Sequence, residues 1–537
     1  MTKRFSLLVI FSIVCQLANA QFAYRYLNQA DDREVERITS IVSDSRIHSS
    51  IRPLRTRDLP SVDSLHSLYP IVGKFGSTWV GRKMLNERLV NVNVPSFQWR
   101  FDPLVDFTLA SESGSTDSRI LYTNTRGFIM EGKIGRDVSF VSSFRENQAL
   151  LPFWVQQFTQ ENRVVPGQGI GRKYSGLGYD FANATGMLTY EAGEYFAFTF
   201  GHGQNFIGEG HRSLFLSDAA FNYPFLKIET NIWRIKYINY FNFMTDIRPE
   251  VEMNDVFARK FTTMHYLSLN LGKRWNISFF ESIVWADSNG TRGFDVNFLN
   301  PIIFYRPIEF SAGSEGSNAL MGIGASYMVK DHWMIYGQFL LDEFRSQDIV
   351  SGGGAWGNKF GWQLGTKWFD AFNVEKLFLR FEMNSARPYT YSHFDVRTNY
   401  GHYNQAIAHP WGANFYEFIL QSSYDFERWG VEWLIDYGLQ GNDDDDNYYG
   451  SGIYQSYDDR PFDKGHDIAR FNRSNLFISD FRLYWMMNPA IRLRTEIGFT
   501  YRSLQFESPI PGQLENQDHM VFSFGFRTNV FNRYYDF

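Results

Sequence analysis

The chain has almost no cysteine, no long apolar run and no strong excess of either charge. Cys15 is the only cysteine among its 537 residues, so the sequence after it cannot form a disulfide or a cysteine-based metal site. No apolar run reaches the roughly 18 residues that a transmembrane helix needs. The formal net charge of −6 is small for this length. Because a nucleic-acid partner would require a strongly basic surface, we expect none.

Aromatic residues, in contrast, are abundant. They make up 18% of the chain, with 52 Phe, 30 Tyr and 14 Trp, although the mean hydropathy is only −0.32. Soluble domains seldom carry so many rings, whereas outer-membrane β-barrels use them in interfacial girdles and in lipid contact.

The segment IRLRTEIGFTY, residues 491–501, shows how apolar and charged residues are arranged. Leu493 and Ile497 fall on one parity, and Arg494 and Glu496 fall on the other. A period of two is that of a β-strand with one apolar and one polar face. In a soluble antiparallel sheet the polar face would meet water, whereas in a membrane barrel the apolar face meets lipid and the polar face lines the lumen.

The same alternation recurs after about residue 97. Because charges of both signs return on the polar face and long polar stretches separate the segments, we favour a barrel over a soluble sandwich. About 440 residues, at roughly ten per tilted strand plus turns and loops, make on the order of 16 to 18 strands. The predicted fold is all-β: a transmembrane antiparallel outer-membrane β-barrel with a small, partly helical N-terminal periplasmic region. The other alternating segments are 233–243, 333–342, 377–384, 431–437 and 477–485.

Both ends of the chain agree with export to the outer membrane. Lys3 and Arg4 precede an apolar run that ends in Ala18-Asn19-Ala20, as in a secretory signal peptide. Near the other end, aromatic residues alternate over 522–526 and the chain stops at Phe537, which resembles the terminal-strand signal of outer-membrane barrels. Apolar residues at helical spacing also predict a helix over 31–44. The predicted domains are a signal peptide at 1–20, an N-terminal periplasmic or plug-like region at 21–95, and a transmembrane barrel with long extracellular loops at 96–537.

The polar strand faces carry charges that can pair across neighbouring strands. Arg492, Arg494 and Glu496 can meet Asp480 and Arg482 of the preceding strand. Charges of mixed sign build a cross-linked lumen, whereas an open diffusion pore favours a one-signed or weakly charged lining. We therefore expect a narrow or plugged barrel. The predicted luminal network comprises Arg380, Glu382, Glu432, Asp436, Asp480, Arg482, Arg492, Arg494 and Glu496.

The most distinctive stretch, residues 200–228, is rich in glycine, which permits sharp turns and bulges at a barrel rim. It contains His211 and Ser213, two residues apart, which on a strand would share one face. A barrel phospholipase uses a lipid-facing His-x-Ser pair, in which the histidine is the base for the serine nucleophile. Here Leu214 and Phe215 follow, rather than the Asn-Gly-Arg of such an enzyme. A lipid hydrolase is thus one interpretation, a structural or ligand-contacting histidine is the other, and we expect no enzyme.

Residues 387–418 mix aromatic rings with amides and histidines in one segment. Sugars place their C–H faces on flat rings and bond their hydroxyls to amides and carboxylates, so this mixture predicts a glycan site. The same residue types also build rigid loops that plug a barrel, and both interpretations stay open. The candidate glycan-binding residues are Tyr389, Tyr391, Tyr400, His402, Tyr403, Asn404, Gln405 and Trp411.

No metal or cofactor is expected. His393, His402 and His409 match no familiar ligand spacing. The run 443–446 could coordinate Ca²⁺ through carboxylate oxygens, but Tyr448 occupies the glycine position of an EF-hand loop. A solvated acidic loop is the alternative.

Three blocks of sequence resemble a known family. The stretch 200–228, with its glycine-rich turn followed by SLFLSD and YPFLKI, is similar to the signature of the capsule-assembly Wzi family of outer-membrane barrels. Residues 280–307, including FLNP, resemble that family's second block, and residues 387–418 are most similar to a branch labelled gliding motility protein RemB. The family's Trp-Gly-Pro-Gly turn reads Ile-Gly-Glu-Gly at 207–210 here.

The resemblance implies an 18-stranded, occluded barrel whose outer face holds exopolysaccharide. The predicted function is accordingly to bind or organise surface exopolysaccharide or capsule, with support for adhesion or gliding motility. The expected partners are outer-membrane lipid, surface polysaccharide, and motility or secretion machinery. A channel for a small solute is the alternative, and the His211/Ser213 lipid hydrolase is the second alternative.

Overall fold

The computed structural model of the chain describes residues 23–44, 46–59, 75–114, 119–174, 176, 178–252, 256–287, 293–302, 317–343 and 353–537. The predicted signal peptide at 1–20 lies outside these residues. No helix in this part of the chain is both long enough and apolar enough to cross a membrane.

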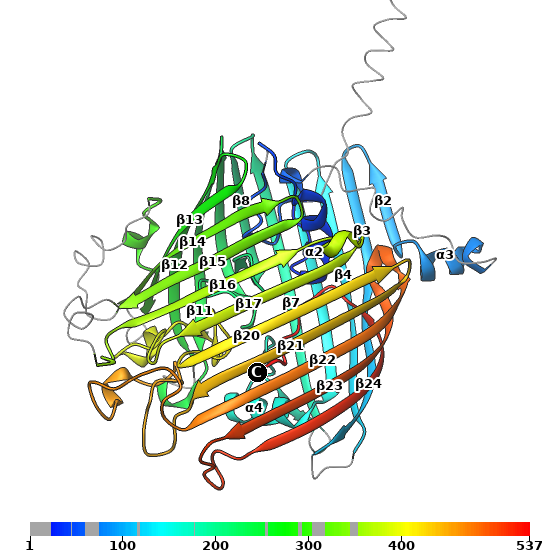
Figure 1. The fold of residues 1–537 in the computed structure, drawn as a ribbon. Helices are drawn as coiled ribbons and strands as arrows, with labels where there is room; N and C mark the ends of the chain where they lie inside the picture. Colours follow the sequence, from blue (N-terminus) through cyan, green and yellow to red (C-terminus); the bar gives the residue numbers. More distant parts are fainter. Residues whose placement is uncertain are drawn as a thin grey trace, which may run out of the picture.

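The described strands form a closed antiparallel barrel (Figure 1). Of the twenty strands in this sheet, β2 (Val90–Val94) and β6 (Arg172–Tyr174) are short additions beside β3 and β7, which leaves eighteen in the barrel wall. The last wall strand pairs with the first, with Phe526 opposite Phe107, so the wall has no free edge. The predicted β-barrel fold is confirmed, and its eighteen wall strands match the upper end of the predicted range of 16 to 18. The wall strands are β3 (Phe97–Ser113), β4 (Leu121–Ile134), β5 (Val138–Leu150), β7 (Gly178–Ala192), β8 (Phe196–Gly203), β10 (Tyr223–Ile232), β11 (Ile235–Asp246), β12 (Ala258–Leu271), β13 (Trp275–Ala286), β14 (Ser317–Lys330), β15 (Trp333–Glu343), β16 (Lys359–Trp368), β17 (Leu377–Ala386), β20 (Phe415–Phe426), β21 (Trp429–Gly441), β22 (Arg473–Asn488), β23 (Leu493–Phe506) and β24 (Gln517–Thr528).

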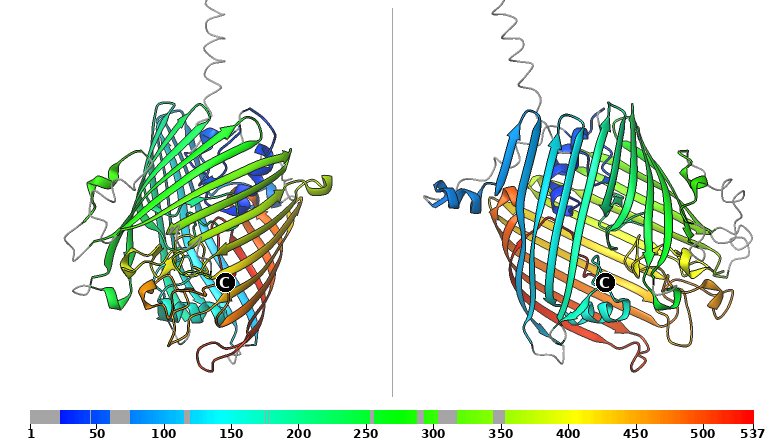
Figure 2. Two further views of the ribbon diagram at one scale, coloured as in Figure 1. Left: turned by 60° about the vertical axis from the view of Figure 1, so that its left-hand side comes forward. Right: turned by 180° about the vertical axis from the view of Figure 1, so that it is seen from behind.

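The two ends of the barrel differ in the length of their connections. Short turns such as 193–195 and 233–234 gather at the upper end in Figure 1. The long connections, including 387–414 and 442–472, gather at the lower end, as the turned views in Figure 2 also show. Outer-membrane barrels have short periplasmic turns and long extracellular loops. The upper end is therefore the periplasmic end and the lower end faces outward.

The outer wall of the barrel is apolar. Ile497 and its cross-strand neighbour Phe524 are exposed, while Arg494 and Glu496 on the opposite parity are buried in the lumen. An exposed aliphatic and aromatic band around a closed barrel is the surface that lipid covers. The chain is an outer-membrane β-barrel. Exposed rings at the short-turn end, among them Trp233, Trp275, Phe372 and Trp429, form an interfacial girdle.

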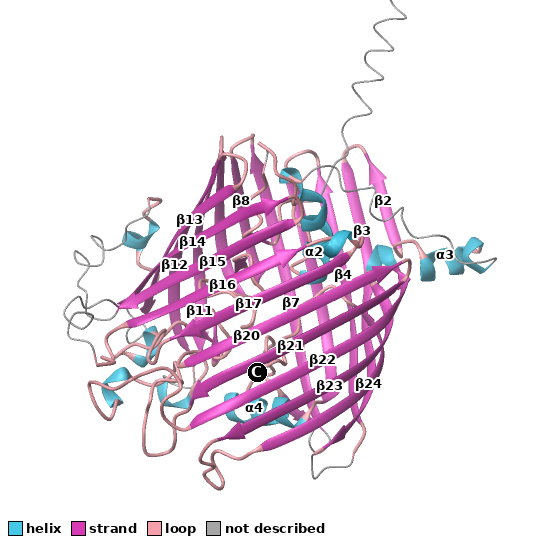
Figure 3. Ribbon diagram, in the orientation of Figure 1, coloured by secondary structure: helices cyan, strands magenta, loops and turns pink. Residues whose placement is uncertain are grey.

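Helices and short strands lie at the ends of the wall and inside it (Figure 3). Helix α2 (Gln29–Thr39) lies within the lumen at the periplasmic end. Asn28 caps its start by accepting from the amides of Ala30 and Asp31, and the helix ends before the exposed Ile41, earlier than the predicted helix. The remaining elements are α3 (Trp79–Leu85), α4 (Phe153–Asn162), β1 (Ile51–Arg52), β9 (Phe206–Ile207), β18 (Gly401–His402) and β19 (Gln405–Ala406).

Two predicted strand positions are corrected by the structure. The proline at 489 starts a 3-10 turn, so β23 begins at Leu493, and Arg492 sits in the turn with a φ of 52°. Its guanidinium reaches Asp31 and Glu34 of α2, and not Asp480 and Arg482 of the preceding strand as predicted. The terminal strand ends at Thr528, and residues 529–537 turn back into the lumen. Phe537 therefore packs on Phe158 of α4, with 4.9 Å between ring centroids, and does not end a membrane strand.

A lysine on the outer wall tests the lipid-facing assignment. Phe522 is exposed at the middle of β24, so Phe522→Lys should lower the free energy of unfolding in phospholipid vesicles by about 2–4 kcal/mol. Phe522→Leu keeps an apolar side chain and should cost much less. Urea titration of the vesicle-inserted protein measures both, and equal stability of the two variants would contradict a lipid-covered wall.

Candidate functional site

The lumen is occupied by segments from four parts of the chain. They are residues 23–44 and 46–59 at the periplasmic end, the glycine-rich loop 204–222, the loop 387–414, and the C-terminal tail 529–537, and we call them the luminal segments. The first two pair directly, since β1 and β9 form a two-stranded sheet with Ile51 opposite Ile207.

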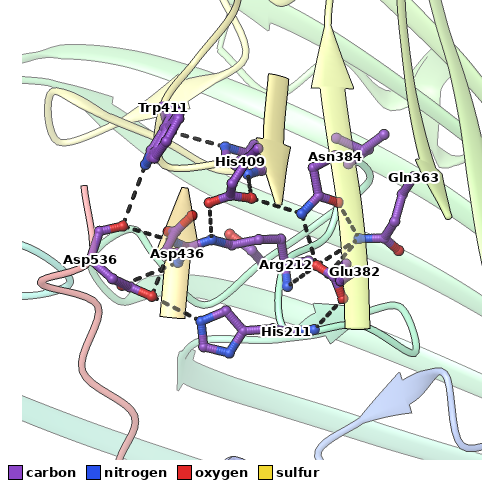
Figure 4. A network of polar contacts seen from close by, with 12 residues as sticks. His211, Arg212, Gln363, Glu382, Asn384, His409, Trp411, Asp436 and Asp536 are labelled. Carbon is purple, nitrogen blue, oxygen red and sulfur yellow. Dashed lines mark hydrogen bonds and ion pairs between the residues drawn. The ribbon is translucent and has the colours of Figure 1, made fainter. Parts of the chain in front are cut away.

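Arg212 joins the glycine-rich loop to the wall and to the tail (Figure 4). Its Nε lies 3.0 Å from Glu417 of β20, and its Nη2 lies 3.3 Å from Asp436 of β21 and 3.1 Å from Asp536 of the tail. All four side chains are buried. We call these four residues the Arg212 cluster. Burial alone would raise the pKa of Asp536, but the Arg212 guanidinium holds it below the ordinary value, so the carboxylate stays charged.

The backbone around Arg212 is fixed as well. Glu382 of β17 accepts hydrogen bonds from the amides of His211 at 2.7 Å and Arg212 at 3.0 Å, and from the Tyr336 hydroxyl at 2.6 Å. A carboxylate that accepts several hydrogen bonds in a dry interior is held in one geometry. The glycine-rich loop is therefore bound to the wall at its centre.

A second buried ion cluster joins this loop to the N-terminal segment. Lys367 of β16 lies 2.7 Å from Glu36 of α2 and 2.6 Å from Glu209 of the loop. Ser49 donates to Glu209 at 2.6 Å. Burial alone would raise the pKa of Glu209, but Lys367 and then Arg52 hold it below the ordinary value. Glu209 stands where the Trp-Gly-Pro-Gly turn has proline, and here it binds two of the luminal segments together.

The C-terminal tail runs along the glycine-rich loop toward the outer end. Tyr534 donates to Asp218 at 2.7 Å, and Trp154 of α4 donates to the Tyr535 carbonyl at 3.0 Å. Asp536 accepts from His211, whose Nε2 lies 3.0 Å away. The tail therefore connects the middle of the lumen to the loop that carries α4.

The predicted luminal charges all lie on the lumen side or at its rim. Arg494 lies 2.8 Å from Glu496 and 3.1 Å from Glu432, and Arg482 lies 2.8 Å from Asp480 and 3.1 Å from Glu496. Glu382 and Asp436 meet the glycine-rich loop as described, Arg492 meets α2, and Arg380 donates to Gln421 at 3.0 Å. The partners that the sequence did not reveal are Arg212, Glu417, Asp536, Lys367 and Glu209.

The candidate glycan-binding residues of the loop 387–414 are almost all buried. Tyr391 and Tyr400 donate to the carbonyls of Leu214 and Phe215 at 3.0 and 2.7 Å. Their contacts fasten this loop to the glycine-rich loop, and in this conformation they offer no free ring face. Of the eight candidates only Tyr403 is partly exposed, and a glycan role for the set stays a prediction. The buried candidates are Tyr389, Tyr391, Tyr400, His402, Asn404, Gln405 and Trp411.

His402 shows how these residues serve the loop. Burial lowers its pKa to about 3, so the ring is neutral. Its Nδ1 accepts from the Thr245 amide at 3.0 Å, which assigns the proton to Nε2, 3.1 Å from the Asn222 carbonyl. The ring thus bridges a wall strand and the glycine-rich loop.

The interpretation of His211 and Ser213 as a lipid-facing pair on one strand is wrong. His211 and Ser213 lie on the bent loop inside the lumen, not on a strand, and both are buried. The His211 ring nitrogens face Gln29 at 2.9 Å and Asp536 at 3.0 Å. The Ser213 hydroxyl donates to the Ile207 carbonyl. Because the loop lies inside the lumen and both side chains have other partners, the pair neither meets lipid nor forms a base–nucleophile contact.

The acidic run in the outer loop 442–472 organises its own backbone. Asp443 accepts from the amides of Tyr449 at 2.6 Å and Gly452 at 2.8 Å, and Asp444 accepts from the Asn447 amide at 2.9 Å. Asp445 and Asp446 are exposed. Within the described ranges, no three His, Cys, Asp or Glu side chains are grouped to hold a metal ion.

The same outer loop carries a group of three rings. Tyr449 stacks on Phe471 with 4.6 Å between centroids and 15° between planes, and Phe462 lies 5.3 Å from Phe471. Phe462 is exposed, and the other two are half-buried. We call Tyr449, Phe462 and Phe471 the loop ring cluster. The exposed carboxylates Asp445, Asp446 and Asp463 belong to the same loop.

The fold is similar to solved outer-membrane barrels. Wzi, an outer membrane protein involved in group 1 capsule assembly in Escherichia coli and described as a carbohydrate binding β-barrel, shares 11% identity at a TM-score of 0.53, over 94% of this chain and 99% of Wzi. OprD of Pseudomonas aeruginosa shares 9% identity at a TM-score of 0.40, over 80% of this chain and 94% of OprD. OpdK of the same organism shares 8% identity at a TM-score of 0.42, over 80% of this chain and 98% of OpdK. No family model and no curated protein matches the chain.

Removing the positive charge of Arg212 should destabilise the barrel strongly. Arg212→Met leaves the buried Glu417, Asp436 and Asp536 without their common cation, so we expect a loss of about 3–5 kcal/mol in unfolding free energy. Arg473→Met removes a surface pair with Glu507 and should cost at most about 1 kcal/mol. Urea unfolding in vesicles measures both. Equal losses would show that the Arg212 cluster does not fix the luminal segments.

Proposed function

We propose that this protein holds surface polysaccharide on its outer loops and does not conduct solute through its lumen. The observation that supports this proposal most is the Arg212 cluster, which fixes the glycine-rich loop and the tail to the wall across the middle of the barrel. A lumen crossed by bonded segments leaves the outer face as the surface that can meet a large ligand.

The chemistry of the outer loops supports a glycan ligand. The loop ring cluster offers a partly exposed aromatic surface, and neighbouring Asp side chains offer hydroxyl acceptors. Sugar rings are recognised by this combination of flat apolar surface and oriented polar groups. The likeness to Wzi, a carbohydrate binding barrel, adds support from outside the chain. Adhesion or gliding, and contact with motility or secretion machinery, rest on the sequence resemblance alone and would follow from the glycan that the loops hold.

A solute channel is the second candidate, and one observation favours it. A cavity of about 260 Å³ lies between the tail and strands β21 to β24, lined by Arg482, Arg494, Arg527 and Asp480. A hexose would fit a space of this size. Swelling of vesicles in isotonic hexose distinguishes the two functions. Vesicles with a polysaccharide-holding barrel should swell no faster than protein-free vesicles, whereas a channel would admit the hexose and increase the swelling rate.

Substitution in the loop ring cluster should weaken glycan binding without affecting the fold. Phe462→Ala removes the exposed ring, and the loss should be comparable to that of one aromatic contact, about 0.5–1.5 kcal/mol, or roughly 2- to 10-fold in Kd. The measurement is binding of purified barrel to polysaccharide extracted from the cells that carry it. Phe522→Leu, on the lipid-facing wall, is the matched control. Unchanged binding by Phe462→Ala and Tyr449→Ala would exclude this loop as the glycan surface.

Deletion of the gene tests the function in the cell. Cells without the protein should lose or loosen their surface polysaccharide while the uptake of small antibiotics stays nearly unchanged. Staining of the glycan layer and a permeability assay on the same strain give both values. A normal glycan layer together with reduced solute uptake would favour the channel instead.

A further inference from the structure

Helix α3 lies outside the barrel, beside its periplasmic end, rather than in the lumen with α2 (Figures 1 and 2). Thr78 caps it by accepting from the Gly81 amide at 3.0 Å. Trp79 is 62% exposed and the preceding Phe75 is 54% exposed. Val80 and Met84, one helical turn apart, are exposed as well. None of the described residues covers these four side chains.

Two buried side chains fasten this helix to the rim of the barrel. Arg428, in the turn between β20 and β21, donates to the Leu85 carbonyl at 3.1 Å and to the Met487 carbonyl at 2.7 Å. Asn488, at the end of β22, donates to the carbonyls of Lys83 at 2.8 Å and Glu87 at 2.9 Å. The last carbonyls of a helix need such partners. The position of α3 is therefore set by the wall, and its apolar side is held outward.

The rim at this point belongs to the interfacial girdle. Phe426 and Trp429 flank Arg428 and are exposed on the lipid-facing side, and Trp429 is the cross-strand partner of Trp485. Girdle rings mark the level of the lipid headgroups. Because Arg428, in the turn between these two rings, holds the C-terminal end of α3, the helix lies at this level and its apolar side continues the lipid-covered surface.

We propose that α3 is an interfacial anchor, whose residues Phe75, Trp79, Val80 and Met84 insert into the periplasmic leaflet of the outer membrane. The occupant of this surface is phospholipid. A short helix that exposes Trp79, Val80 and Met84 and carries Arg82 and Lys83 in its last turn has the mixed apolar and basic composition of segments that lie in the membrane plane. The inserted rings fix the depth at which the barrel sits and hold the segment that precedes β2 against the membrane. This inference does not depend on the glycan proposal.

A spin label at Val80 tests the anchor in the full-length protein. In a Cys15→Ser background, Val80→Cys carries the label, and the protein is inserted into phosphatidylethanolamine and phosphatidylglycerol vesicles. Power saturation compares access by oxygen, which concentrates in lipid, with access by a water-soluble nickel chelate. Ile497→Cys on the wall and Asp446→Cys on the outer loop provide the lipid and water references.

The label at Val80 should favour oxygen over the nickel chelate several-fold more than the label at Asp446, approaching the value at Ile497. A value equal to that of Asp446 would overturn the proposal. Dipolar broadening that appears at high protein density and vanishes on dilution with lipid, together with loss of oxygen access, would assign the surface to a second copy of the chain. Asn488→Ala, which frees the Lys83 carbonyl of α3 and the Glu87 carbonyl just after it, should reduce the oxygen preference at Val80 while the label at Ile497 is unaffected. An unchanged preference in that variant would contradict the role given to the rim.

Discussion

The contact of Arg212 with Glu417, Asp436 and Asp536 is the constraint on which the rest of the lumen depends. A guanidinium and three carboxylates removed from water are stable only when all of them meet, because each charge left alone carries a large desolvation cost. The four groups come from a luminal loop, two wall strands and the C-terminal tail. They therefore assemble together, and the closed wall and the filled lumen form one cooperative unit.

This arrangement separates the two surfaces of the protein by chemistry. The outside of the wall is apolar and meets lipid. On the inside, the polar side chains of the wall form hydrogen bonds and ion pairs with the luminal segments. Lys367 binds both the N-terminal helix and the glycine-rich loop, so the periplasmic half is closed by the same kind of contact. The outer rim, where the loop ring cluster and exposed carboxylates lie, is the surface on which we propose that a large ligand binds.

The wall could be predicted from the sequence, because strand parity is a local property. Ile497 and Arg494 differ by three positions, and their opposite parity already predicts lipid on one side and lumen on the other. The Arg212 cluster could not be predicted, since Arg212 and Asp536 are 324 residues apart and nothing local marks either residue. Tyr391 and Tyr400 were good glycan candidates by residue type. Their burial follows from the inward fold of the loop, which places their hydroxyls on the carbonyls of residues 214 and 215. Loops that bind sugar and loops that fill a barrel use the same residues, and only the direction of the loop distinguishes them.

We propose that the luminal segments seal the barrel against ions. Ion conductance across a planar bilayer that contains the purified full-length protein measures this directly. A sealed lumen predicts a membrane whose conductance stays at the protein-free baseline, and it predicts discrete open levels once Arg212 is replaced by methionine. Steady, voltage-independent open levels from the unsubstituted protein would contradict the claim, because ions would then have a continuous path past the tail and the glycine-rich loop.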